Sequence, residues 1–118
     1  MIEIWKRFRF EAAHRLPKTA PTHRCYNLHG HNFTVTLSFA GEVDEDGWLL
    51  DFAEIETAWQ PIMALVDHKY LNDVPGLENP TSEIISIWIW QKIRPQVPSL
   101  VAVEVQENDD SGAIYRGD

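Results

Sequence analysis

The feature that most constrains this chain is a histidine pair at the start of a strictly alternating segment. His29 and His31 precede residues 32–39, where apolar and polar residues alternate with the period of a half-buried β-strand. The apolar members are Phe33, Val35, Leu37 and Phe39. Both histidines share their parity, so the two imidazoles project from one face, about 6–7 Å apart along the strand. Such a pair can converge on one metal ion, although a lone His-x-His also fits two hydrogen-bonded histidines near the surface.

A second amphipathic segment places a third histidine beside this pair. Between Ile2 and His14 the even positions are mostly apolar and the odd ones mostly charged, which predicts another strand with His14 on its apolar side. If the two strands pair antiparallel, His14, His29 and His31 meet on one face at one edge of the sheet. Three neutral imidazoles with an open fourth position are typical of a catalytic zinc site. A closed structural site usually needs several cysteines, and the chain has only Cys25.

Composition describes one ordinary globular domain over residues 1–118, with 44% apolar and 24% charged residues. The formal net charge of −8 argues against nucleic acid or an anionic membrane as a partner. A single cysteine excludes an intrachain disulfide and fits a reducing compartment. Because the sequence shows no signal peptide and no apolar run of about 18 residues, we expect a soluble, cytoplasmic protein.

Two helices are predicted after the second strand. Residues 41–47 read as a turn, with 48–50 extending the hairpin. Asp51 and Glu54 have the spacing of a capping box, which starts a helix that should close near residues 67–68. Pro61 lies inside this helix, so we expect a kink or a break one turn before it.

The second predicted helix begins at Thr81 or Ser82, after a loop over residues 71–80, and ends at Pro95. It is apolar on nearly all sides, with five isoleucines and two tryptophans between residues 84 and 93. A monomer of this size can hardly bury every side of a helix, so we expect one side to face another subunit.

The last strands bring a carboxylate into the pattern. Residues 100–107 alternate again, with Glu107 on the apolar parity, and a short closing strand follows over 113–116. A carboxylate on that face is costly to desolvate unless hydrogen-bond donors or a cation compensate it; otherwise the strand has already reached solvent. The order of elements predicts an α+β domain with two helices packed on one face of a four-stranded antiparallel sheet.

Taken in order, these motifs resemble those of one enzyme family over essentially the whole chain. They are Phe10–Leu16, Cys25–Asn32, Leu65–Asn72, Glu78–Glu83, Glu107 and Ile114–Gly117. The set resembles the 6-pyruvoyltetrahydropterin synthase family. Within it, the three residues between Cys25 and His29-Gly30-His31 resemble the bacterial 6-carboxytetrahydropterin synthases of queuosine biosynthesis, whereas pyruvoyl-forming synthases carry a longer gap. Members of that family vary after the glutamate, and the resemblance assigns no role to the acidic segment Asn108–Asp110.

The resemblance implies a tunnelling fold (T-fold), in which subunits pool their sheets into a β-barrel, expected as a homohexamer of two trimers with sites between subunits. It implies a zinc-dependent lyase that converts 7,8-dihydroneopterin triphosphate to 6-carboxy-5,6,7,8-tetrahydropterin, releasing acetaldehyde and triphosphate. By motif position the Zn²⁺ ligands are His14, His29 and His31. The catalytic residues are Cys25 as base, with Asp67 and His68 as its proton-relay partners. The substrate residues are Glu107, which anchors the pterin, and Thr81 and Ser82, which help to hold its ring.

Three alternatives remain open at this point. A cupin-like metal dioxygenase also uses His-x-His on a strand, but it places a carboxylate a few residues later, and the next acid after His31 is Glu42. A non-catalytic pterin- or metal-binding module would have no use for Cys25 beside the metal. The pyruvoyl-forming reaction, a triphosphate elimination, shares the machinery of the carboxy-forming one, so the residues leave the product open.

Overall fold

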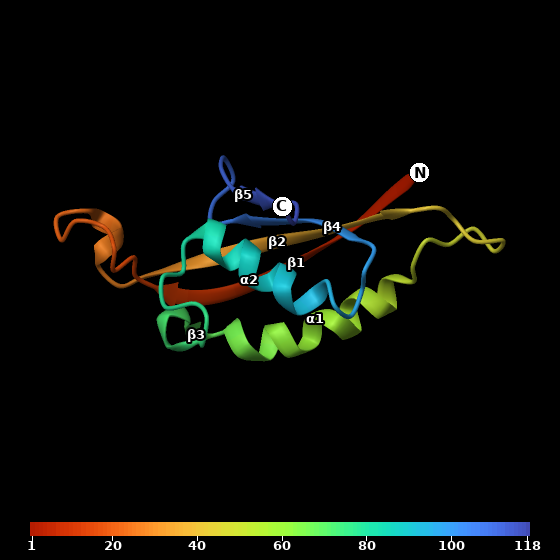
Figure 1. Ribbon diagram of the computed structural model, residues 1–118. Coiled ribbons are helices and arrows are strands. Elements are labelled where there is room, and N and C mark those ends of the chain that lie inside the picture. The colour runs from red at the N-terminus through yellow and green to blue at the C-terminus, as the bar shows by residue number, and fades with distance from the viewer.

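Two long antiparallel strands form the spine of the computed structural model, which describes residues 1–118 (Figure 1). They are β1 (Ile2–His14) and β2 (His29–Gly41), and their register runs unbroken from Ile2 opposite Gly41 to His14 opposite His29. On the other side of β2, β4 (Leu100–Gln106) pairs antiparallel, followed by β5 (Ala113–Tyr115). The sequence predicted all four of these strands, three of them from alternation and β5 as a short closing strand after a turn. The long register carries His14 and His29 to the same end of the sheet.

A fifth strand makes the prediction of a four-stranded antiparallel sheet wrong. β3 (Lys69–Tyr70) pairs parallel with β1, so the sheet is mixed and has the order β3-β1-β2-β4-β5. The strand forms because the chain runs along β1 after the first helix, where the His68 N–H donates to the Glu11 carbonyl. A strand of two residues is too short to show a periodic pattern in the sequence. A short 3₁₀ turn, η2 (Leu71–Asp73), follows inside the segment predicted as a loop.

The first helix, α1 (Phe52–Val66), begins at the predicted capping box of Asp51 and Glu54. It runs continuously through Pro61, so the expected break does not occur. The reason is that Pro61 and Thr57, whose carbonyl loses its helical donor, both lie on the exposed side of the helix. Water can satisfy that carbonyl there. The predicted extension of the hairpin over residues 48–50 is also wrong, because the Asp44 side chain closes a turn by accepting from the Asp46 and Trp48 N–H groups.

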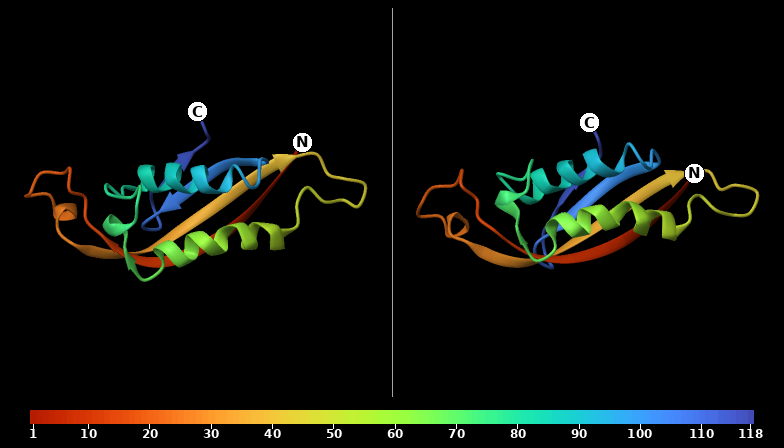
Figure 2. Two further views of the ribbon diagram at one scale, coloured as in Figure 1. Left: turned by 60° about the horizontal axis from the view of Figure 1, so that its bottom comes forward. Right: turned by 90° about the horizontal axis from the view of Figure 1, so that it is seen from below.

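Both helices cover the same face of the sheet, as Figure 2 shows. The second, α2 (Ser82–Ile93), is capped by the Thr81 hydroxyl, which accepts from the Ile84 N–H. The buried core between the layers includes the apolar members of β2, all fully buried, and Trp59 of α1. This packing stabilises the strand on which two of the three histidines lie.

Most of the apolar surface of α2 is covered by its own chain. The Trp88 indole donates to the Pro75 carbonyl, and the Trp90 ring packs edge-on against Tyr115 of β5 at 5.4 Å between centroids. Only Ile84 and Ile87 of its apolar residues stay half-exposed. The expectation that this helix needs another subunit to bury one side therefore loses its basis.

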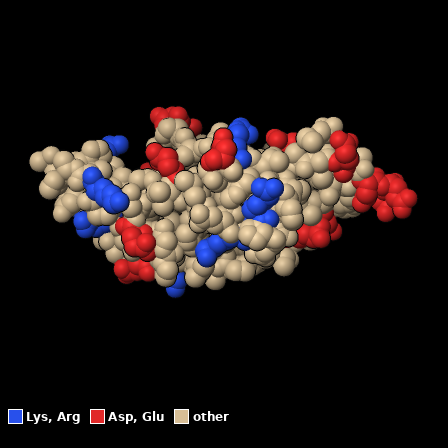
Figure 3. Space-filling view, in the orientation of Figure 1, with Lys and Arg blue, Asp and Glu red and all other residues tan.

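The face of the sheet away from the helices is open and polar. It carries Arg7, Arg9, Asn32, Thr34 and Thr36 on the strands β1 and β2. Two loops project at opposite ends of the molecule, residues 15–28 and residues 42–51 (Figure 1). Figure 3 shows acidic side chains gathered at the end formed by loop 42–51. No helix in the chain has both the length and the apolar character required to cross a bilayer.

Candidate metal centre and active site

The three histidines meet at one edge of the sheet, where the sequence predicted them. His14 ends β1 directly opposite His29, which begins β2, and His31 follows on the same face. Their ring centroids lie 4.6 to 5.2 Å apart, and one ligand atom from each lies within 4.8 Å of the others. The three side chains thus form a cluster that could hold a metal ion.

Backbone carbonyls orient two of these imidazoles. His14 Nδ1 lies 2.9 Å from the Pro80 carbonyl, and His29 Nδ1 lies 2.8 Å from the Asn27 carbonyl. Because a carbonyl only accepts, each Nδ1 carries the hydrogen and each Nε2 presents a lone pair. His14 Nε2 and His29 Nε2 are buried and have no hydrogen-bond partner. A buried acceptor without a donor is costly, and a cation between the rings would satisfy both atoms.

Burial favours the neutral form that a metal ligand requires. The His14 ring is fully buried, and desolvation lowers its pKa below the usual value of a histidine. Desolvation also lowers the pKa of His31, against the opposing charge of Glu107. Neutral imidazoles with converging lone pairs fit a borderline-soft divalent cation, so the residues present suit the metal that the resemblance implies.

Glu107 reaches into the cluster from the end of β4. Its Oε1 lies 3.9 Å from His14 Nε2, its Oε2 lies 3.5 Å from His31 Nε2, and its side chain is 24% exposed. The Ser82 hydroxyl donates to Oε1 at 3.1 Å, from the first residue of α2. Glu107 therefore lies against the histidine cluster and is not a fully solvated strand end. Thr81, by contrast, uses its hydroxyl oxygen to cap α2.

Cys25 lies in the loop that joins the two long strands, within a 3₁₀ turn, η1 (Arg24–Tyr26). The thiol residue is half-buried. Its N–H donates to His23 Nδ1 at 3.0 Å, and its carbonyl accepts from the Leu16 N–H at 2.7 Å. The Arg15 guanidinium stacks over the Tyr26 ring at 4.7 Å, which attaches the turn to the end of β1. The turn is thus held from both sides of Cys25.

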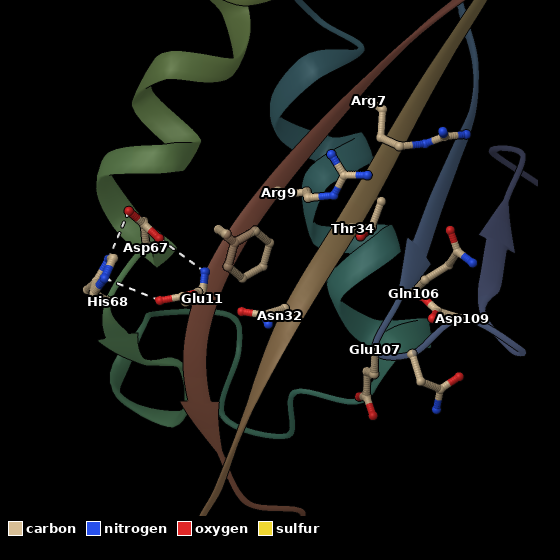
Figure 4. Close-up of a pocket in the computed structure, with 12 residues that line it drawn as sticks. Arg7, Arg9, Glu11, Asn32, Thr34, Asp67, His68, Gln106, Glu107 and Asp109 are labelled. Carbon is tan, nitrogen blue, oxygen red and sulfur yellow. Dashed lines mark hydrogen bonds and ion pairs between the residues drawn. The ribbon is translucent and has the colours of Figure 1, made fainter.

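Asp67 and His68 lie elsewhere, at the edge formed by β1 and β3. His68 Nδ1 is 3.0 Å from Asp67 Oδ2, and His68 Nε2 is 3.5 Å from Glu11 Oε2. The Glu11 N–H donates to Asp67 Oδ1, and this bond, together with the one from His68, lowers the pKa of Asp67. Figure 4 shows this group on one side of a cleft of about 1030 Å³ and Glu107 on the other. No hydrogen bond or ion pair joins the Cys25 thiol to Asp67 or His68 within the chain.

Sequence reasoning missed three residues that support the site. His23 holds the Cys25 turn, Glu11 holds the Asp67–His68 pair, and Asn72 holds Arg15 through its N–H at 3.0 Å and its carbonyl at 2.9 Å. The contacts of Glu11 and Asn72 join segments about 56 residues apart. No spacing rule in the sequence marks such distant pairs.

Comparison with known proteins is consistent with this arrangement. A family model described as 6-pyruvoyl tetrahydropterin synthase matches residues 3–118. A 6-carboxy-5,6,7,8-tetrahydropterin synthase of Synechocystis sp. is 41% identical over 95% of this chain and 91% of its own length. A 6-pyruvoyl tetrahydrobiopterin synthase of Dictyostelium discoideum is 37% identical over 80% of this chain and 75% of its own.

The fold agrees with a solved structure as well. The 6-pyruvoyl tetrahydropterin synthase of Caenorhabditis elegans matches with a TM-score of 0.91 at 27% identity, covering 99% of this chain and 96% of that one. Two helices packed on one face of a mixed sheet are thus the T-fold that the resemblance implied. With a match over residues 3–118 and a relative at 41% identity, the chain belongs to the 6-pyruvoyl tetrahydropterin synthase family and is a lyase.

Proposed function

We propose that the chain is a zinc-dependent lyase that converts 7,8-dihydroneopterin triphosphate to 6-carboxy-5,6,7,8-tetrahydropterin with release of acetaldehyde and triphosphate, in queuosine (7-deazapurine) biosynthesis. The observation that carries the proposal is the convergence of three imidazoles on one point with the Glu107 carboxylate facing them. The name of the Synechocystis relative and the three-residue gap between Cys25 and His29 support the carboxy-forming reaction.

His14, His29 and His31 would hold the zinc, since three neutral imidazoles leave a fourth position open. When bound there, zinc supplies Lewis acidity that lowers the pKa of the hydroxyls on the substrate side chain. Cleavage of the carbon–carbon bond then needs a base for a hydroxyl proton, and the Cys25 thiolate fits that role. The dihydropterin ring accepts the electrons of the broken bond.

Glu107 and Ser82 would hold the pterin ring. The ring presents a 2-amino group beside N3–H, two parallel donors that match the two oxygens of a carboxylate. Ser82 already fixes one oxygen of Glu107 by its hydrogen bond at 3.1 Å. Thr81 supports the ring indirectly, because its hydroxyl caps the helix that carries Ser82. The loop over residues 15–28 carries Arg15, Lys18 and Arg24 and no acid, which suits the anionic triphosphate.

The proton relay would be completed between subunits. Within one chain the Cys25 thiol does not contact the Asp67–His68 pair, so a second copy has to bring that pair to the thiol. The outer edge of β1 supports assembly: Ala12 and Ala13 pair with β3 and Glu11 bonds to Asp67 and His68, which leaves the edge from Ile2 to Phe10 without a neighbouring strand. Unpaired edges favour addition of another strand. We propose the homohexamer of two trimers, with sheets joined edge to edge into a barrel.

Mass spectrometry of the product tests the proposal. Metal-loaded protein incubated with 7,8-dihydroneopterin triphosphate should form 6-carboxytetrahydropterin, and the Cys25→Ala variant, with its metal retained, should form none. The 37% identical Dictyostelium relative favours the second candidate, a 6-pyruvoyltetrahydropterin synthase-type triphosphate elimination. A 6-pyruvoyl product would select that candidate. Unchanged substrate would indicate a non-catalytic pterin- or metal-binding module.

A further inference from the structure

We propose that Glu107 is a displaceable fourth ligand of the metal centre, whose carboxylate occupies the open position whenever no substrate is bound. The inference rests on the proposed function only in requiring that a metal ion binds His14, His29 and His31. It gives Glu107 two successive partners, the metal ion and then the pterin ring.

The carboxylate of Glu107 lies close enough to the histidine nitrogens to share a cation with them after a small rotation of the side chains. Two ligands at 2.0–2.1 Å from a tetrahedral zinc ion lie about 3.3–3.4 Å apart. Glu107 Oε2 lies 3.5 Å from His31 Nε2, and Oε1 lies 3.9 Å from His14 Nε2. Both separations exceed those of good N–H···O hydrogen bonds, so these atoms are not held together by shared protons.

The hydrogen positions make the same point for His14. Its Nδ1–H donates to the Pro80 carbonyl, so its Nε2 offers a lone pair to a carboxylate that also only accepts. Ser82 donates to Oε1 alone, and the nearest nitrogen to Oε2 is His31 Nε2 at 3.5 Å, beyond the length of a good hydrogen bond. Two acceptors that face each other at the edge of a buried cluster repel unless a cation lies between them. A cation shared by the histidines and Glu107 satisfies every one of these lone pairs.

The place of Glu107 in the chain permits the exchange. β4 ends at Gln106, so the Glu107 backbone lies outside the ladder with β2, and the turn over residues 108–111 follows directly. Strand pairing therefore does not fix this residue, and its side chain borders both the histidine cluster and the cleft, with the Ser82 hydroxyl as its hydrogen-bond partner. When the ring donors draw the carboxylate away, the fourth position opens for the substrate hydroxyls. Binding of the ring and opening of the metal are then coupled through one side chain.

Cobalt(II) binding without substrate tests the proposal. Chelator competition should give Glu107→Gln and Glu107→Ala an affinity for Co²⁺ about 10- to 100-fold below that of the parent. The visible absorption band should also change, since an oxygen ligand has been replaced. The matched control is Glu83→Gln, which removes an exposed acid from the first turn of α2 and should bind like the parent. Circular dichroism would verify that the variants are folded.

Parent-like Co²⁺ affinity and an unchanged absorption band in both Glu107 variants would overturn the inference. That result would leave the proposed function standing, because the three histidines would still bind the ion alone. A parent that takes up neither Co²⁺ nor Zn²⁺ would instead overturn the proposed function, and this inference with it. Metal uptake by the parent thus separates the two failures.

Discussion

At the scale of single residues, two buried imidazole nitrogens favour a cation as the ligand of the histidine cluster. His14 Nε2 and His29 Nε2 lack a hydrogen-bond partner, while the Nδ1 atom of each ring is engaged by a carbonyl. A buried acceptor without a partner lowers the stability of the folded protein unless a donor or a cation pairs with it. The backbone thus holds the lone pairs toward a common point in advance, which reduces the cost of ordering the ligands when a cation binds.

This arrangement predicts that the metal depends on the pair on β2. Substituting His29→Ala and His31→Ala together removes two of three ligands, so the variant should lose its zinc, against about one zinc per chain in the parent. Elemental analysis of the purified proteins measures this directly. His23→Ala serves as a control, because His23 binds the Cys25 backbone and not the cluster. A double variant that still carries stoichiometric zinc would refute the ligand assignment.

Parity, together with the expected antiparallel pairing of the first two strands, predicted that the three histidines meet, because alternation fixes which residues share a face of the sheet. It also placed Glu107 on that face. It did not predict that Ser82 holds the Glu107 carboxylate, since that contact depends on how α2 packs beside β4. The supporting roles of His23 and Glu11 could not be predicted from the sequence for the same reason. Each contact depends on where the chain turns, and no periodic pattern encodes that.

At the scale of elements, one clamp connects the segments around the site. Asn72, the middle residue of η2, bonds to both the N–H and the carbonyl of Arg15, directly after β1. Arg15 in turn stacks on Tyr26 of η1, beside Cys25. The end of β1, the thiol-bearing turn and the segment after Asp67–His68 are therefore positioned together, although they are distant in sequence.

We expect Asn72→Ala to loosen this clamp. The variant loses two hydrogen bonds to the Arg15 backbone, which predicts a loss of about 1–3 kcal/mol in the free energy of unfolding. Zinc content should stay unchanged, while turnover falls because the Cys25 turn is less well held. Urea melts, metal analysis and turnover on one preparation measure all three. Gln91→Ala, an exposed amide on α2, is the matched control. Parent-like stability would show that Asn72 adds nothing.

The Asp67 carboxyl predicts a specific acid sensitivity. Its pKa is lowered in the folded chain by the Glu11 N–H and by His68. A carboxyl with a lower pKa in the folded state contributes stability above its unfolded pKa, and this contribution is lost as pH falls toward the folded value. Asp67→Asn should therefore be less stable than the parent at neutral pH, with the difference narrowing below about pH 4. Urea melts from pH 7 to pH 3 measure this; a constant difference would contradict it.

Patterns in the sequence predicted the elements with clear periods or caps. The alternation located β1, β2 and β4, and the capping signals located the starts of α1 and α2. β3 was not predicted because its pairing with β1 follows from where α1 ends and not from its own two residues. The prediction of a break at Pro61 was wrong because the cost of proline in a helix depends on whether the freed carbonyl is exposed to water.

At the scale of the whole molecule, the sheet of a single chain has a long strand edge without a hydrogen-bonded neighbour. The outer edge of β1 is unpaired over most of its length, and Ile2 and Trp5 on it are about half-exposed. The thiol and its predicted relay partners lie apart in the chain. Both features find an explanation if copies of the chain join at their edges. The cytoplasmic location stays a prediction from the sequence.

Light scattering on the purified protein tests this assembly. We expect the mass of a hexamer, about six times the 13.6 kDa of one chain. Introducing a charge on the unpaired edge with Trp5→Glu should shift the mass toward smaller species, because a buried edge cannot accommodate a carboxylate. Trp48→Glu, an equally exposed tryptophan on loop 42–51, is the control. A stable monomer of the parent at micromolar concentration would argue against sites shared between subunits.

The most direct measurement is the stoichiometry of the two small products. Zinc-loaded protein is given 7,8-dihydroneopterin triphosphate, and acetaldehyde and triphosphate are quantified in the same reaction. The account predicts equal amounts of both, because cleavage of the carbon–carbon bond and loss of the triphosphate occur once per turnover. Triphosphate without acetaldehyde would contradict carbon–carbon cleavage and indicate the pyruvoyl-forming reaction. Release of neither product would contradict catalysis on this substrate altogether.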